Sequence, residues 1–465
     1  MKRTSACFGS IKVRDGWRCL PGVLRKTAPV LGPLVILLLA QLSLSAAGLY
    51  RDGIGARSMA LGGTEVARPQ DPLGAFGANP AGAAFLQAPT ADLGLSGVDA
   101  MGHFSNTANN GATLRNGLAI LPDAAFGMPL PNRPVGVFVG AAPDAALNAD
   151  WRFVDAPGGA DGATTYGLQR HRSKILVIRS GIGIGWAVTP QVSLGGGFGP
   201  VYNENTLQAP YIFQTQPALK GVKTLLDLNT SGVGWNGQVG LLLHPHRDLQ
   251  FGFAYKSPTT VHSHGDASGN AGVQLANLGL GAARPDFHYD AEVVNHFPQM
   301  VSGGFDWQAC PRCRLSFQVD WINWNEAFER LPVKLTHGNN SDLNGLVGSN
   351  AMEDDVPLNW KNQLVYRGGI EYTLTEGLWL RGGYSYGNNP VPEATLTPLT
   401  AAIMQHTLTA GLGYAWGRYQ ADFAYQWDIP TSRHVGQSGL LDGEYNNSTT
   451  KVQLHWIGIT VSARF

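Results

Sequence analysis

The chain has 465 residues, of which 60 are glycine and only 14% are charged, and its formal net charge is zero. A composition so poor in charge, with 12 Trp and 14 Tyr, is typical of a large strand-rich protein and does not favour a soluble enzyme. Residues 1–47 hold seven of the 33 basic residues but one of the 33 acidic ones. The remainder is acidic and gives no basis for nucleic-acid binding, which needs clustered Lys and Arg.

Residues 1–47 are predicted to be a signal peptide. A basic region that ends at Lys26 precedes the apolar run "APVLGPLVILLLAQLSLSAAG", and Ser45 and Ala47 are placed for cleavage before Gly48. The unbroken apolar core of this run, residues 34–40, is too short to span a bilayer, so a retained membrane anchor is the weaker alternative. We expect an exported and processed chain.

The next segment, residues 48–89, is rich in small residues and contains the stretch "GAFGANPAGAAFLQAP" at 74–89. Gly and Ala allow a chain to fold compactly without bulky side chains, and the Asn79-Pro80 pair forms a corner because the residue before a proline is kept out of the helical region. A simple turn in a linker is the alternative reading of this pair.

From residue 90 onward the sequence alternates with a period of two. In "RYQADFAYQWD" (418–428) the aromatic residues Tyr419, Phe423 and Tyr425 share one face with Ala421. Such a face is directed inward in a soluble sandwich and outward to lipid in a membrane barrel. We predict fourteen strands of about ten residues. Their short links centre on residues 131–134, 189–191, 244–248, 309–313, 375–377 and 416–418. Their long links fall near 99–118, 142–173, 205–230, 265–296, 327–360, 388–404 and 430–449.

Short turns at one rim and long loops at the other are typical of outer-membrane barrels with an even strand number. The fold class predicted is therefore all-β, a 14-stranded antiparallel transmembrane β-barrel in a bacterial outer membrane. The glycine-rich runs "GIGIGW" and "GGGFGP" lack the βαβ context of a dinucleotide loop, so we interpret them as small residues facing the lumen. The chain ends in "WIGITVSARF", and a last strand ending in Phe465 resembles the signal that the barrel assembly machinery recognises.

This arrangement resembles the outer-membrane long-chain fatty acid transporters (FadL-type), a family that includes aromatic-hydrocarbon channels. The resemblance is carried by "NPAG" at Asn79–Gly82, and by further matches in 240–258, 297–328 and 380–392. It implies a hatch at residues 48–89 that plugs a barrel at residues 90–465. Gate residues would be Asn79, Pro80, Ala81 and Gly82. It also implies passive uptake of hydrophobic molecules, by loop capture, interior binding and hatch-gated release into outer-membrane lipid.

Candidate ligand-binding residues come from two apolar loops and from arginines on lumen-facing positions. Exposed apolar clusters often mark binding surfaces, and an arginine can pair with a carboxylate head group. The candidates are Tyr211, Ile212, Phe213, Leu219, Leu225, Leu226, Leu275, Leu278, Arg179, Arg367 and Arg381. Packing between the two loops and ion pairs that brace the wall are the alternatives.

Long-chain fatty acids are the first expected substrate, and aromatic or aliphatic hydrocarbons are the alternative. The alternative gains weight because "VYNENTLQ" (201–208) and "LTAAIMQHTL" (399–408) lack the basic residues that fatty-acid transporters tend to carry there. A general porin and an outer-membrane hydrolase are less favoured. The sequence has no G-x-S-x-G elbow, no H-E-x-x-H motif and no phosphate loop, so no catalytic residues are predicted.

Cys310 and Cys313 form a single C-x-x-C across a predicted tight turn. A zinc site of this type needs a second ligand pair, so a local disulfide is expected in an oxidising compartment. The H-x-H pairs at 244–246 and 262–264 could bind a metal only adventitiously, and no metal site or cofactor is predicted.

Overall fold

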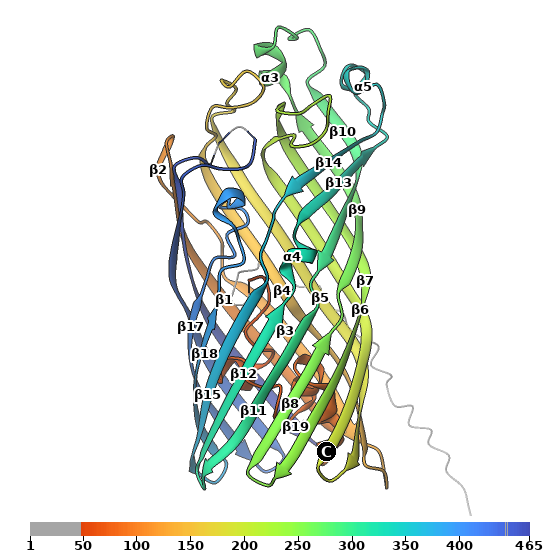
Figure 1. Ribbon diagram of the computed structural model, residues 1–465, viewed down its shortest axis with the longest axis vertical. Coiled ribbons are helices and arrows are strands. Elements are labelled where there is room, and N and C mark those ends of the chain that lie inside the picture. Colours follow the sequence, from red (N-terminus) through yellow and green to blue (C-terminus); the bar gives the residue numbers. More distant parts are fainter. Residues whose placement is uncertain (1–47, 442, 444) are drawn as a thin grey trace, which may run out of the picture. The chain divides into compact units, whose positions relative to one another are not determined.

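The computed structural model describes residues 48–441, 443 and 445–465. The predicted signal peptide, residues 1–47, lies outside the described residues. In the described part, one antiparallel sheet of 19 strands forms a closed 14-strand barrel with an extension at one end (Figure 1). The barrel closes where β1 pairs with β19, in a register that runs from Thr90 opposite Arg464 to Ser105 opposite Thr449. The predicted fold class is thus confirmed.

Fourteen strands make up the barrel wall. They are β1 (Thr90–Asn106), β3 (Ala119–Pro129), β4 (Val135–Val154), β5 (Leu168–Thr189), β6 (Val192–Ile212), β7 (Lys223–His246), β8 (Leu249–Lys256), β11 (Met300–Cys310), β12 (Cys313–Ile322), β15 (Gln363–Thr375), β16 (Leu378–Gly387), β17 (His406–Trp416), β18 (Tyr419–Val435) and β19 (Ser448–Arg464).

The remaining elements belong to the hatch, to the extension or to connecting segments. The hatch holds α1 (Ala56–Ala60), α2 (Pro72–Gly77) and η1 (Pro80–Phe85). The other elements are β2 (Asn109–Thr113), β9 (Thr259–Asn270), α3 (Gly272–Asn277), β10 (Asp286–Phe297), α4 (Trp324–Ala327), β13 (Arg330–Thr336), α5 (Ser341–Val347), β14 (Met352–Pro357) and η2 (Glu393–Thr395). Among the described residues no helix is long and apolar enough to cross a membrane.

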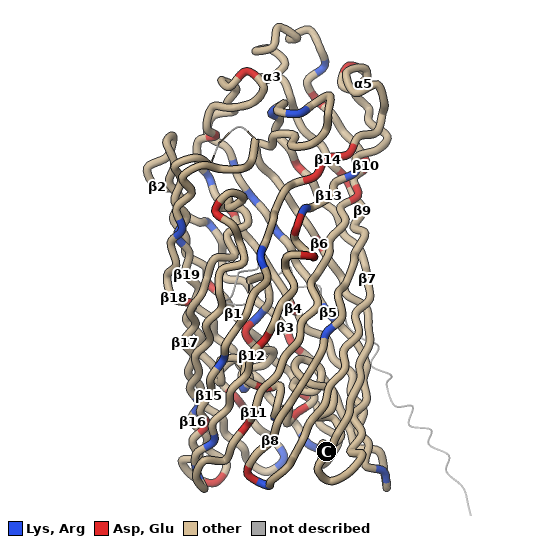
Figure 2. Tube along the Cα trace, in the orientation of Figure 1, with Lys and Arg blue, Asp and Glu red and all other residues tan. Residues whose placement is uncertain are grey.

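The outer surface of the barrel is apolar because each strand alternates. In β18 and β19, Phe423 lies opposite Ile459 and Tyr425 opposite Ile457, and all four side chains are exposed. The intervening residues, such as Asp422 and Gln426, are buried in the lumen. Figure 2 shows long stretches of strand without a charged residue. An exposed apolar band around a polar interior is the arrangement expected of a barrel in lipid.

The two ends of the barrel differ as predicted. The six short links lie at one end, where for example β5 ends at Thr189 and β6 begins at Val192. At the other end the long links are partly strand. β6 continues to Ile212 and β7 starts at Lys223, so the predicted loop 205–230 is in fact a loop only at 213–222. The reason is that backbone hydrogen bonds between β6 and β7 continue beyond the apolar band.

The extension carries β9, β10, β13 and β14 together with α3 and α5 (Figure 1). Its loops are tied by Gln274 of α3, which is fully buried. The Gln274 Oε1 atom accepts hydrogen bonds from the backbone N–H groups of Ala160 and Lys223, both at 3.1 Å, and its Nε2 atom donates to Asp161 at 3.0 Å. Desolvation raises the pKa of Tyr166 to about 12, so its hydroxyl stays protonated and donates to the Asn270 carbonyl at 3.0 Å. Loop 155–167 is therefore fixed against the extension.

Candidate functional site

The hatch lies inside the barrel at the end with short turns (red in Figure 1). Its helices are short and largely buried, and α1 packs on β18 and β17 while η1 packs on β5 and β6. Asp71 caps α2 by accepting a hydrogen bond from the Gly74 N–H at 2.7 Å, and Pro72 occupies the first helical position, which has no need of an N–H donor. A fully packed segment of this kind blocks the lumen.

The Asn79-Pro80 corner is built into the barrel wall. The Asn79 side chain is fully buried, and its Nδ2 atom donates to the carbonyls of Val66 at 2.8 Å, Leu241 at 3.2 Å and Phe253 at 3.3 Å. Its Oδ1 atom accepts from the Ala81 N–H at 3.1 Å and so caps η1. One amide therefore joins two parts of the hatch to two neighbouring strands, β7 and β8. The position is consistent with the gate role predicted for these residues, which remains a proposal.

Wall glycines provide the space for this corner. A Cβ atom on Gly240 would overlap the Asn79 amide, and one on Gly195 would overlap the backbone at Pro80 and Ala81. A Cβ atom on Gly185 would overlap η1 in the same way. The glycine-rich runs are small lumen-facing residues, as predicted, because the hatch backbone approaches the strands more closely than any side chain would permit.

Buried ion pairs hold the remainder of the hatch. Arg367 on β15 lies 2.6 Å from both Asp52 of the hatch and Asp320 of β12. Arg381 on β16 pairs with Glu371 at 2.7 Å and with Asp422 at 2.5 Å. Within the hatch, Arg57 pairs with Glu65 at 3.0 Å, and Arg68 of the hatch pairs with Glu371 of β15 at 3.1 Å. Removing one partner of such a buried pair leaves an uncompensated charge, so these contacts fix the position of the hatch.

The barrel wall has a gap between β3 and β4. The two strands pair only from Ala124 opposite Ala141 to Pro129 opposite Gly136. Beyond this point residues 142–149 of β4 are all buried, and they stay paired with β5. A bulge between Pro143 and Ala145 lies where the pairing with β3 ends. Bulges commonly bend a strand and end its pairing.

The start of the hatch fills this gap. Tyr50 forms an antiparallel bridge with Ala145, so residues 49–51 add a short strand to β4. Arg51 binds Asp123 of β3 through two hydrogen bonds of 2.6 and 3.2 Å, and its guanidinium also donates to the Ser96 hydroxyl at 3.0 Å. Ile120 of β3 lies opposite Gly97, the neighbour of Ser96, and its apolar side chain is exposed. The filled gap therefore borders the apolar outer surface of β3.

An apolar cavity of about 190 Å³ lies between the hatch and the long-loop end. Apolar side chains of β6, β7, β13 and β14 dominate its lining. They include Tyr211, Ile212, Phe213, Leu226, Leu228, Leu331, Val333, Leu335 and Val356, with Thr395, Thr397, Leu399, Thr400, Leu440, Leu441 and Tyr445 from two further segments. Leu49 of the hatch and Leu147 of β4 line it on the side of the gap.

The polar groups of the cavity are few and already paired. Asp354 on β14 accepts a hydrogen bond from the Tyr211 hydroxyl at 2.5 Å and further bonds from the backbone N–H groups of residues 214–216 at 2.6 to 3.0 Å. Lys174 is the single basic residue among the described lining residues, and its Nζ atom lies 2.8 Å from Glu204. An apolar pocket with a few fixed polar groups is the usual form of a small-molecule site.

The predicted ligand residues divide into three groups. Tyr211, Ile212, Phe213 and Leu226 line the cavity. Leu219 packs one layer behind it, and Leu225 faces a separate surface groove. Leu275 is buried in α3 and Leu278 is exposed there, and neither lines the cavity.

The three arginines are not cavity residues either. Arg367 and Arg381 form the ion pairs described above, and Arg179 donates to the Phe76 carbonyl at 3.1 Å with its guanidinium 4.1 Å from the centre of the Phe76 ring. Arg367 and Arg179 thus contact the hatch directly, and Arg381 binds Glu371, which also binds Arg68 of the hatch, so the three have the bracing role that was the alternative.

The disulfide expected between Cys310 and Cys313 remains a prediction. Cys310 and Cys313 lie opposite each other in register across the β11–β12 turn, but both are free thiols in the structure. The sequence spacing predicts their proximity correctly, whereas register alone does not determine whether the sulfurs are bonded.

The sequence matches a known protein family. Residues 37–465 match the family model described as outer membrane protein transport protein (OMPP1/FadL/TodX). The chain belongs to this family. A search of curated proteins gives no match.

Solved structures of the FadL/TodX type are similar over nearly the whole chain. The toluene transporter TodX of Pseudomonas putida is 18% identical with a TM-score of 0.70, covering 90% of this chain and 100% of that one. The toluene transporter TbuX of Ralstonia pickettii is 20% identical with a TM-score of 0.68, covering 89% and 99%. A FadL homologue of Pseudomonas aeruginosa is 16% identical with a TM-score of 0.70, covering 90% and 100%. At these identities the likeness shows the fold alone.

Membership of the family identifies the chain as an outer-membrane channel for hydrophobic substrates and not as an enzyme. The end with long loops is then extracellular and the end with short turns periplasmic. The sequence did not predict the part of the cavity that β13, β14 and segment 395–400 form, because these elements fall in regions predicted as loops. The alternation of the apolar residues Leu331, Val333 and Leu335 was the pattern in the sequence that could have predicted β13 and its apolar face.

Proposed function

We propose that this channel takes up small neutral hydrophobic molecules of about the size of one aromatic ring. The observation that carries the proposal is the cavity, with its volume of about 190 Å³ and its apolar lining. An apolar cavity of about 150 Å³ can hold benzene, whereas pockets for larger ligands measure about 300–1,000 Å³. Toluene and similar hydrocarbons fit this size, and two of the similar structures are of toluene transporters.

The polar groups support a neutral ligand over a fatty acid. A carboxylate that entered the cavity would meet the carboxylate of Asp354, and the one nearby cation, Lys174, is already paired with Glu204. A buried anion is costly unless a cation or several donors are available to it. Long-chain fatty acids, the first expectation from sequence, remain the alternative substrate.

The exit proposed is lateral. Leu49 and Leu147 join the cavity to the β3–β4 gap, and Arg51 with Asp123 occupies that gap. A hydrophobic molecule that leaves through the gap enters outer-membrane lipid directly and avoids the water below the hatch. Movement of residues 49–51 away from β4 would open this path.

Uptake of radiolabelled toluene and oleate by a host that lacks its own transporter tests the proposal. We expect toluene uptake that depends on the protein, little oleate uptake, and no loss of toluene uptake in a Lys174→Met variant. Oleate uptake that Lys174→Met abolishes would instead assign a fatty acid. A large ion conductance of the parent protein in a planar bilayer would favour a general porin.

Export and assembly are part of the same proposal. Cleavage before Gly48 is expected, and N-terminal sequencing of protein from the outer membrane tests it. The C-terminal strand ending in Phe465 is proposed to bind the barrel assembly machinery. Deletion of Phe465 should then lower the amount of assembled barrel without changing uptake per assembled molecule.

A further inference from the structure

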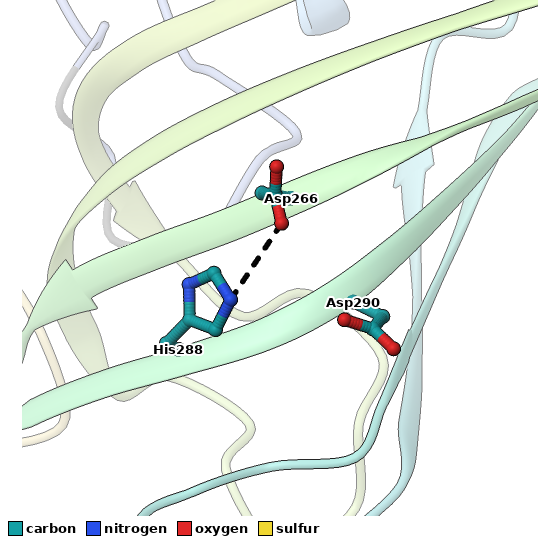
Figure 3. Close-up of side chains that lie close together, drawn as sticks. All are labelled: Asp266, His288 and Asp290. Carbon is teal, nitrogen blue, oxygen red and sulfur yellow. Dashed lines mark ion pairs between the residues drawn. The ribbon is translucent and has the colours of Figure 1, made fainter.

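Three metal-ligand side chains converge on the outer face of the extracellular extension. Asp266 of β9 and His288 and Asp290 of β10 place their ligand atoms within 4.8 Å of one another (Figure 3). The His288 Nε2 atom lies 3.6 Å from the Asp266 Oδ1 atom. All three side chains are exposed, so an ion could reach them from the medium.

Strand register brings these residues together. Asp266 lies directly opposite Asp290 in the β9–β10 pair, and His288 lies opposite Ser268, one position further along the same face. Residues two apart on a strand project to the same side, so the convergence is a property of the sheet and not of a flexible loop. The sequence separation of the two strands conceals it, which is why no metal site was predicted.

A second histidine contacts this cluster from the segment after β13. The His337 Nδ1 atom lies 2.8 Å from the Asp290 Oδ2 atom. His337 has a positive φ of 56°, an uncommon conformation for a residue other than glycine. Asn339 holds the segment in place, because its backbone N–H donates to the His288 carbonyl at 3.1 Å and its Oδ1 atom accepts from the His288 N–H at 3.0 Å.

One imidazole and two carboxylates form a donor set that suits zinc, with solvent in the fourth position. Ligand atoms about 2.0–2.2 Å from a tetrahedral zinc lie ~3.4 Å from each other. The His288 Nε2 and Asp266 Oδ1 atoms, 3.6 Å apart, are close to this spacing, and the Asp290 ligand atom lies within 4.8 Å of both. The ion pairs of Asp266 and Asp290 among the described residues are with histidines and not with Lys or Arg, so no fixed cation competes with a metal.

We propose that Asp266, His288 and Asp290 bind one zinc ion on the extracellular surface. The ion would join β9 to β10, and it would steady the segment that follows β13 through the contacts of His337 with Asp290 and of Asn339 with His288. The opposite faces of these elements carry Val293 and Leu335, which line the cavity. Zinc would therefore fasten the wall of the ligand cavity from outside, and its removal would loosen the extension without unfolding the barrel.

Calorimetric titration of zinc into the full chain tests this proposal. The protein is purified in detergent without a histidine tag, and calcium serves as a control ion because imidazole nitrogens do not suit it. We expect one zinc per chain and at least tenfold weaker binding in a His288→Asn, Asp290→Asn double variant. His434→Asn is the matched control, since His434 is an exposed strand histidine outside the cluster, and it should bind zinc as the parent does.

Limited proteolysis gives a second readout. Zinc should slow cleavage within residues 338–351 of the parent and of His434→Asn, but not of the double variant. Equal zinc affinity in the double variant, or no protection of this segment in the parent, would overturn the proposal and indicate an adventitious ion only. Heat-modifiable migration on a gel confirms that each variant is a folded barrel.

Discussion

Arg51 joins the hatch to the edge of the β3–β4 gap, so its removal tests how the gap is closed. The Arg51→Met variant keeps a long side chain but removes the guanidinium that lies 2.6 Å from Asp123. The two side chains are only 3% and 0% exposed, so Asp123 would keep a buried charge without a partner. Breaking a buried ion pair in this way costs about 3–5 kcal/mol. That cost shifts the equilibrium between the seated and the unseated hatch by roughly two to four orders of magnitude.

The assay is ion conductance in a planar bilayer, combined with the temperature at which the barrel loses its heat-modifiable gel mobility. The parent should conduct little, and Arg51→Met should conduct more and unfold at a lower temperature. The Arg51→Met, Asp123→Asn double variant removes both charges and should recover most of the closed state. Arg170→Met is the matched control, because the Arg170–Asp150 pair has the same 2.6 Å distance but is partly exposed.

Two results would refute this reasoning. If Arg51→Met is as closed and as stable as the parent protein, the ion pair does not hold the hatch in the gap. If the double variant conducts as much as the single variant, the unpaired charge of Asp123 is not the cause of the opening. The shape of the Arg51 side chain would then be what keeps the hatch in the gap.

Three further predictions concern the cavity, the hatch and the extension. Leu228→Trp fills part of the cavity and should lower toluene uptake severalfold while gel mobility stays that of the parent; unchanged uptake would place the path elsewhere. Gly240→Val should displace η1 and expose the hatch to protease, whereas Gly368→Ala, which meets no atom within 4 Å, should not; equal protection in both would contradict the close packing. Gln274→Ala removes three hydrogen bonds and should speed protease cleavage within 271–285 on intact cells, and an unchanged rate would show that loop 155–167 is held by other contacts.

The membrane part of the fold could be predicted because one physical pattern governs it. Lipid on one side and a polar lumen on the other impose strict alternation, as in residues 419–428, and tight turns mark every periplasmic link. Beyond the apolar band this constraint ends. Residues 205–212 and 223–230 still form strands, but their sequences "NTLQAPYI" and "KTLLDLNT" do not alternate strictly between apolar and polar residues.

The site was harder to predict because it depends on register and on departures from regularity. Tyr211 and Phe213 could be found from apolarity alone, but the sequence of residues 142–149, "APDAALNA", gives no sign that their pairing with β3 is absent. Asp266 and His288 are distant in sequence and meet only through the β9–β10 pairing. The sequence could place the three arginines on lumen-facing positions but could not give their role. Alternation along a strand gives the direction of a side chain and not the residue that it contacts.

The hatch is attached to strands that the ribosome makes last. The Ala56 N–H donates to the Thr460 hydroxyl across 404 residues of sequence, and the Thr409 hydroxyl donates to the Ala60 carbonyl across 349. Contacts so distant in sequence form late because the loops they close are long. The first segment of the barrel protein to be made must therefore wait for the last, and its final attachment coincides with closure of the sheet. Assembly and plugging become a single event, so a sealed molecule is produced without an open pore as a stable intermediate.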